Sequence, residues 1–138
     1  MDNLKKPLDN EGWSAHYNIE SLNVVVEAIK SGNVSVWSEE LTKICPGGAK
    51  TLEIGCGTGI SSLWLAKNGR KVTALDYTES SVELVKEAVK RLNLNNVDII
   101  HYDATKELPF EEKQFDYIFQ AGLLEHFETE EQVRLLRN

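Results

Sequence analysis

One stretch decides the fold of this chain: Leu52-Glu53-Ile54-Gly55-Cys56-Gly57-Thr58-Gly59. Its apolar start, residues 51–54, indicates a short strand that runs directly into glycines. Gly55 and Gly57 permit a sharp turn and let the backbone come close to a ligand, because no side chain intervenes. A helix is expected to follow, and its N-terminal amides suit a carboxylate or a phosphate. A tight strand-to-helix turn without a ligand is the alternative interpretation.

Hydrophobic periodicity predicts that helices and strands alternate around this stretch. Residues 1–20 are polar and irregular, with Trp13 and Tyr17 as candidate anchors. Helices are expected at 21–30, 38–44, 60–68 and 78–92 and from 129 onward, and strands at 51–54, 71–75, 97–101 and 115–119. Such alternation builds a parallel sheet from βαβ units. We therefore expect an α/β fold with an open, mainly parallel, doubly wound sheet, divided into an N-terminal helical region at 1–48 and an α/β domain at 49–138.

Two helix starts have the spacing of a capping box, in which a hydroxyl side chain and a later Glu or Gln satisfy free backbone groups. Ser80 and Glu83 have this spacing, with Thr78 as an equally good cap, and the residues that open the last helix, 129–132, have it as well. The basic stretch at 86–91 is interleaved with apolar residues at helical spacing, which indicates the solvated face of a helix.

Polar side chains follow three of the predicted strands. Asp76, Asp103 and Gln120 each follow a strand, as the glycine loop follows the first one. The carboxyl ends of parallel strands lie along one edge of the sheet, and open α/β sheets bind ligands at that edge. Four strand ends are therefore expected to converge on one site.

Charge and composition exclude several classes of protein. The 138 residues include 15 Lys and Arg against 22 Asp and Glu, a formal net charge of −7. Such a surface repels a phosphate backbone, so nucleic acid is not an expected partner. The start of the chain lacks the apolar core of a signal peptide, and no apolar run is long enough to span a membrane. A cytoplasmic location is the expectation.

Metal and disulfide chemistry find no support in the sequence. The two cysteines, Cys45 and Cys56, do not form a Cys-x-x-Cys pair, so neither a disulfide framework nor a zinc motif is present. The three histidines lie in separate segments without a carboxylate or cysteine at ligand spacing: His16, His101 and His126. We predict no metal site.

Glycine spacing separates two nucleotide-type cofactors. The dinucleotide fingerprint Gly-x-Gly-x-x-Gly would require glycine at position 60, where Ile60 stands. The sequence instead reads Gly-x-Gly-x-Gly after the acidic Glu53. This segment resembles the first motif of class I S-adenosylmethionine-dependent methyltransferases. A nicotinamide-dependent oxidoreductase is kept as an alternative, because such enzymes also have an acidic residue after the second strand.

The resemblance implies S-adenosyl-L-methionine as cofactor, S-adenosyl-L-homocysteine as product, and a role for each matching residue. Gly55, Cys56 and Gly57 would contribute the backbone of the loop. Asp76 would bind both ribose hydroxyls, since a carboxylate offers two acceptor oxygens to a diol. Tyr77 would cover the adenine with its ring, or be an ordinary half-buried loop residue.

Further matches follow the third and fourth strands. The resemblance implies that Asp103 and Ala104 clamp the adenine, that backbone groups at Gln120 meet the methionine amino group, and that Glu53 orders the loop and the methionine end. His126 is either a general base or a packing residue at the start of a helix. Trp13 and Tyr17 either fold over the cofactor or pack in the core.

The implied reaction is methyl transfer to an unknown, small-molecule acceptor, with this chain supplying the cofactor site. The resemblance covers about residues 50–130, and three of the seven strands of the family sheet have no sequence here. We expect a truncated piece of a longer enzyme. The alternative is a non-catalytic S-adenosylmethionine-binding or self-associating module that pairs through the exposed edge of its fourth strand.

Overall fold

A computed structural model of the chain describes residues 10–137. Its elements follow one another as α1 (Asn10–Ser14), α2 (Ile19–Ser31), α3 (Val36–Ile44), β1 (Lys50–Ile54), α4 (Ile60–Lys67), β2 (Lys71–Asp76), α5 (Glu79–Leu92), β3 (Val97–His101), β4 (Tyr117–Phe119), the 3-10 helix η1 (Leu124–His126) and α6 (Thr129–Arg137). The alternation of strands and helices expected from the sequence is confirmed.

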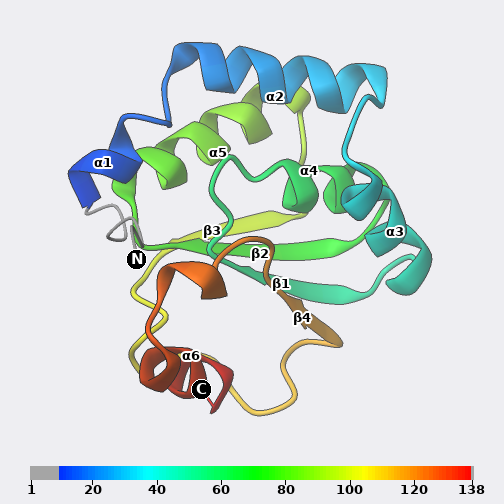
Figure 1. Cartoon of the computed structure of the whole chain (residues 1–138). Helices are drawn as coiled ribbons and strands as arrows, with labels where there is room; N and C mark the ends of the chain where they lie inside the picture. Colours follow the sequence, from blue (N-terminus) through cyan, green and yellow to red (C-terminus); the bar gives the residue numbers. More distant parts are fainter. Residues whose placement is uncertain (1–9, 138) are drawn as a thin grey trace.

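The four strands form one parallel sheet in the order β3-β2-β1-β4. Glu53 of β1 is the register partner of Ala74 in β2 and of Phe119 in β4, so the strands end close together. Helices α2, α4 and α5 cover one face of the sheet, and α6 lies on the other side (Figure 1). This arrangement is the expected open, doubly wound α/β fold, and it brings four strand ends to one edge.

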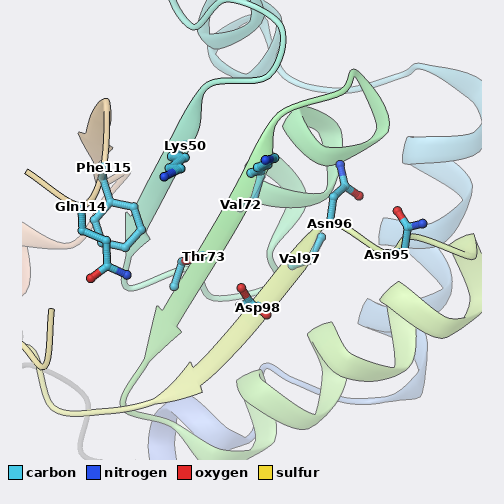
Figure 2. Close-up of a pocket in the computed structure, with 10 residues that line it drawn as sticks. Lys50, Val72, Thr73, Asn95, Asn96, Val97, Asp98, Gln114 and Phe115 are labelled. Carbon is cyan, nitrogen blue, oxygen red and sulfur yellow. The ribbon is translucent and has the colours of Figure 1, made fainter. Parts of the chain in front are cut away.

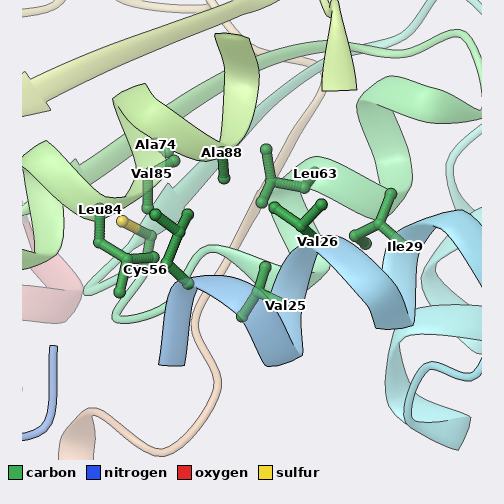
Figure 3. Packing of buried hydrophobic residues seen from close by; sticks show 10 residues of the cluster. Val25, Val26, Ile29, Cys56, Leu63, Ala74, Leu84, Val85 and Ala88 are labelled. Carbon is green, nitrogen blue, oxygen red and sulfur yellow. The ribbon is translucent and has the colours of Figure 1, made fainter. Parts of the chain in front are cut away.

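The core lies between the sheet and its three covering helices. Val25, Val26 and Ile29 of α2 point toward Leu63 of α4 and toward α5 (Figure 3). The buried cluster consists of Leu22, Val25, Val26, Ile29, Cys56, Leu63, Ala74, Leu84, Val85 and Ala88. Helix α2 therefore shares one core with the glycine loop and with the sheet.

Two expected boundaries were wrong. Residues 10–14 form the short helix α1, although the segment 1–20 was expected to be irregular; residues 1–9 lie outside the described part of the chain. Strand β4 begins at Tyr117 rather than at residue 115. Phe115 instead packs edge-to-face against Phe110, with ring centroids 4.9 Å apart, before the strand begins.

The capping box at the start of α5 was also wrong. Thr78 is the N-cap residue, but its side chain makes no capping hydrogen bond. The Ser80 hydroxyl is buried without a hydrogen-bond partner, and Glu83 pairs with Lys86 at 2.8 Å instead. At the start of α6, where the second capping box was expected, the Gln132 side-chain amide instead donates to the carbonyl oxygens of Leu124 and Phe127.

Within residues 10–137, none of the helices has the length and apolarity to cross a membrane.

Candidate cofactor site

A cavity of about 540 Å³ lies at the carboxyl ends of all four strands. Its wall contains all of the residues that the sequence nominates for the cofactor except Gln120: Glu53, Gly55, Cys56, Gly57, Asp76, Tyr77, Asp103 and Ala104. The predicted convergence of strand ends therefore produces a real cavity, and the carboxylates of Asp76 at the end of β2 and of Asp103 after β3 belong to one wall.

The glycine loop uses most of its own amides inside the protein. The N–H groups of Gly55 and Cys56 both donate to the Leu75 carbonyl oxygen, at 2.8 and 3.0 Å. The Gly57 N–H donates to the Asp76 carboxylate at 2.8 Å. These three amides are therefore already paired within the protein. Burial raises the pKa of the Cys56 thiol well above its ordinary value, so this side chain contributes packing rather than a nucleophile.

Asp76 ties the loop to the second strand. One carboxylate oxygen accepts the Gly57 N–H and the other accepts the Thr78 N–H, each at 2.8 Å. The residue is 7% exposed and still lines the cavity. Because each carboxylate oxygen has two acceptor positions, the side chain can hold both backbone amides and still accept hydrogen bonds from a diol.

Glu53 is buried beneath the loop. Its Oε2 accepts hydrogen bonds from the backbone N–H of Ser62 at 3.2 Å and from the Ser62 hydroxyl at 2.5 Å. Burial raises the pKa of Glu53 to about 7, against the lowering effect of Ser62 and with a further increase from Asp76. The charge of the cavity floor therefore changes near neutral pH.

We expect the Glu53→Gln variant to remove part of the pH dependence of stability. Folding raises the pKa of Glu53 from 4.5 to about 7. The folded state therefore binds a proton that the unfolded state has lost, and stability falls as pH rises between these values. Urea unfolding between pH 5 and pH 8 should show a loss of about 2 kcal/mol in the wild type that is absent in Glu53→Gln. Equal slopes for the two proteins would show that Glu53 ionises normally.

Asp103, Ala104 and Tyr77 lie on the outer part of the wall. Oδ1 of Asp103 accepts the Thr105 N–H at 3.0 Å and the Thr105 hydroxyl at 2.6 Å, while Oδ2 is 3.9 Å from the Lys106 ammonium. The Tyr77 carbonyl oxygen is 2.7 Å from Nε2 of His101, which fixes its backbone, while the residue itself is 49% exposed. The Asp103 carboxylate and the Tyr77 ring are both accessible to a planar ligand.

Gln120 does not line the cavity. Its side-chain oxygen accepts the Leu123 N–H at 2.8 Å and so shapes the turn after β4, and the neighbouring Ala121 and Gly122 form the wall there. Leu123 also lines the cavity, although nothing in its local sequence predicted this position. Its side chain packs against the bare Cα of Gly55, a contact between distant segments that periodicity does not reveal.

The three residues with open roles, Trp13, Tyr17 and His126, all line the cavity. Tyr17 also packs against the buried cluster, which is the core packing expected as one of its two alternatives. Burial, helped by the nearby Asp76 and Cys56, raises the pKa of Tyr17 to about 12. The cavity is also lined by Tyr102, Thr105 and Phe127. The sequence could have predicted these positions, because they lie next to the motif residues.

The cavity is acidic. Its wall contains three carboxylates and, among the described residues, neither lysine nor arginine. This charge suits a cationic ligand such as a sulfonium and disfavours a pyrophosphate. Within the part of the chain that the structure describes, no group of His, Cys, Asp and Glu side chains is placed to hold a metal ion.

A second cavity, of about 380 Å³, lies at the opposite, amino-terminal end of the strands (Figure 2). Lys50 and Lys71, register partners at the starts of β1 and β2, line it together with Gln114 and Phe115. It contains none of the residues nominated for the cofactor. The sheet therefore separates the two cavities.

The fold and the site together define a doubly wound α/β protein with a nucleotide-type cofactor cavity at its strand ends. A family model described as "Methyltransferase domain" matches residues 51–138. The chain belongs to this methyltransferase family, and its Rossmann-like fold is that of the class I S-adenosyl-L-methionine-dependent methyltransferases.

Known relatives are longer than this chain. The demethylmenaquinone methyltransferase of Listeria welshimeri is 36% identical over 87 residues, which are 59% of this chain and 36% of that protein. The enzyme of the same name from Bacillus cytotoxicus is 34% identical over 105 residues, 72% of this chain and 44% of that protein. The chain thus spans less than half the length of these curated relatives.

Solved structures share the fold. The PH0226 protein of Pyrococcus horikoshii OT3 is 30% identical, with a TM-score of 0.68, and the match covers 78% of this chain and 50% of that chain. A SAM-dependent methyltransferase from Aquifex aeolicus matches with a TM-score of 0.64 at 24% identity, over 94% of this chain and 66% of that chain.

Proposed function

We propose that this chain supplies the cofactor site of an enzyme that transfers a methyl group from S-adenosyl-L-methionine to a small-molecule acceptor. The observation that carries the proposal is the cavity wall, where Glu53, Asp76 and Asp103 surround the glycine loop and no lysine or arginine of the described residues joins them. A cavity of about 540 Å³ is of a size that small-molecule and cofactor sites have. The division at residue 48 and a cytoplasmic location remain part of this proposal.

Each wall residue has a task in the proposal. The carboxylate of Asp76 accepts from the ribose hydroxyls, Asp103 with the backbone of Ala104 recognises the adenine, and Tyr77 covers the ring. Glu53 and the backbone near Gln120 orient the methionine end. The bound cofactor supplies an activated methyl group and a neutral leaving group. The chain itself contributes alignment and exclusion of water, which account for much of the rate in such reactions.

The curated relatives support a small-molecule acceptor, because they are named for methyl transfer to demethylmenaquinone. A nicotinamide-dependent oxidoreductase fits less well, since Ile60 stands where its third glycine would be and the described cavity wall offers no lysine or arginine to a pyrophosphate. A purely binding or self-associating module is less favoured, because the chain belongs to a family of methyltransferases.

Isothermal titration calorimetry of the 138-residue chain tests the cofactor. We expect S-adenosyl-L-homocysteine to bind in the micromolar range and NADH not to bind, because the acidic wall repels a pyrophosphate. A matched control is Lys71→Ala, which alters only the second cavity and should leave the affinity unchanged. Preferential binding of NADH, or a folded chain that binds neither compound, would contradict the proposal.

A further inference from the structure

Two segments from opposite ends of the chain both rest on the glycine loop. A Cβ atom placed on Gly57 would lie 3.3 Å from the hydroxyl oxygen of Tyr17, which follows α1. A Cβ atom placed on Gly55 would lie 2.7 Å from Cδ1 of Leu123, which precedes η1. The floor of the cofactor cavity is therefore in contact with both the N-terminal segment and the segment after β4.

The same two segments also touch each other. The rings of Trp13 and His126 lie edge-to-face, with centroids 4.7 Å apart and an angle of 79°. Both side chains are half-buried and both line the cofactor cavity. Tyr17 and Leu123, which lie against the loop, line the same cavity as this pair. A ligand in the cavity would therefore lie next to this aromatic pair.

The segment that carries His126 is firmly held. The turn before η1 is fixed by the Leu123 N–H, which donates to the Gln120 side chain at 2.8 Å. The carbonyl oxygens of Leu124 and Phe127 accept from the Gln132 amide of α6, at 3.0 and 2.9 Å. Within residues 10–137, the ring nitrogens of His126 have no hydrogen-bond partner, so its ring contact with Trp13 is its specific interaction.

The segment that carries Trp13 lies on the other side of this contact. Within the described residues, α1 packs against α5 and is followed by a turn into α2. The turn that joins it to α2 is well defined, because the Asn18 side chain caps α2 and the Ser21 hydroxyl donates to the His16 carbonyl oxygen at 2.6 Å. The ring contact between Trp13 and His126 therefore joins the α1 segment to the segment after β4.

We propose that Trp13 and His126 form an aromatic clasp over the cofactor cavity, which must part to admit and to release the cofactor. The inference rests on the proposed function. Such a clasp slows entry and exit alike, because the same contact parts in both directions. This distinguishes it from a simple contact with the cofactor, whose loss would raise the dissociation rate alone.

Surface plasmon resonance with S-adenosyl-L-homocysteine and the immobilised 138-residue chain measures both rates. We expect Trp13→Ala and His126→Ala each to raise association and dissociation rates about three- to tenfold, with little change in Kd. His126→Phe keeps an aromatic edge and should leave both rates near those of the wild type. Trp37→Ala is the matched control, because Trp37 is 43% exposed on α3 and does not line the cavity.

The double variant Trp13→Ala/His126→Ala should be no faster than either single variant, because both remove the same contact. Unchanged rates in the single variants would overturn the clasp and leave the proposed function intact. A rise in the dissociation rate alone would also overturn it, since Trp13 would then be an ordinary cofactor contact. A folded wild-type chain that binds no S-adenosyl-L-homocysteine would overturn both proposals.

Discussion

Gly59→Ala is expected to destabilise the fold by about 2–5 kcal/mol. Gly59 precedes α4 with a φ of +73°, where an L side chain costs about 1–2 kcal/mol. A Cβ atom there would also lie 2.7 Å from Cγ2 of Val85 and 3.0 Å from its Cγ1. Val85 is fully buried where α5 meets α2 (Figure 3), so it cannot retreat without disturbing the core, and such overpacking costs about 1–3 kcal/mol.

Urea unfolding separates the two costs when a second glycine is tested in parallel. Gly69 has a φ of +83°, but a Cβ atom placed on it would have no neighbour within 4 Å, so Gly69→Ala should show only the conformational cost. The double variant Gly59→Ala/Val85→Ala should lose less stability than the sum of its single variants, because truncation of Val85 makes room for the new methyl group. If Gly59→Ala costs no more than Gly69→Ala, the close approach of α5 to the loop is wrong.

The fold could be predicted because its determinants are local. Each strand is a short, mostly apolar run that stops at a glycine or a polar residue, and helices α2 and α5 have a clear amphipathic period. The glycine loop is the clearest case: Gly55, Gly57 and Gly59 all have positive φ, the conformation that their residue type favours. The family resemblance rested on the same local spacing, and the match of residues 51–138 to the family agrees with it.

The hydrogen bonds inside the site could not be predicted in this way. Asp76 was expected to bind the ribose hydroxyls, and the sequence did not indicate that both of its carboxylate oxygens also accept backbone N–H groups. The proximity of Trp13 to His126, and of Leu123 to Gly55, depends on how the two ends of the chain meet over the loop. Sequence periodicity carries information about one face of one element and none about such distant pairs.

The capping box expected at the start of α5 was wrong because of where the helix begins. A capping box requires a hydroxyl that faces the free amides of its own helix, and the spacing of Ser80 and Glu83 satisfies this rule. In the folded chain the helix begins at Glu79 after the N-cap residue Thr78, so Ser80 lies inside the first turn and its hydroxyl is buried without a partner. The N–H of Thr78 itself is held by the Asp76 carboxylate, at 2.8 Å.

The dual role of Asp76 leads to the largest effect on binding that we expect. Asp76→Asn should weaken S-adenosyl-L-homocysteine binding about 100-fold or more, because hydrogen bonds to a charged acceptor contribute about 1.5–3 kcal/mol each. The Asn amide nitrogen is a donor and cannot accept a backbone N–H, so either the Gly57 or the Thr78 amide also loses its partner. The free energy of unfolding should therefore fall by about 1–3 kcal/mol as well.

Calorimetry and urea unfolding of the same samples distinguish the two consequences. Asp98→Asn is the matched control, since it removes an exposed carboxylate of the neighbouring strand β3 that lines only the second cavity. It should change neither affinity nor stability. If Asp76→Asn is less stable but binds S-adenosyl-L-homocysteine within threefold of the wild type, then Asp76 holds the glycine loop and does not bind the cofactor. The cofactor's ribose would then need another partner, and Asp103 is the remaining exposed carboxylate in the cavity wall.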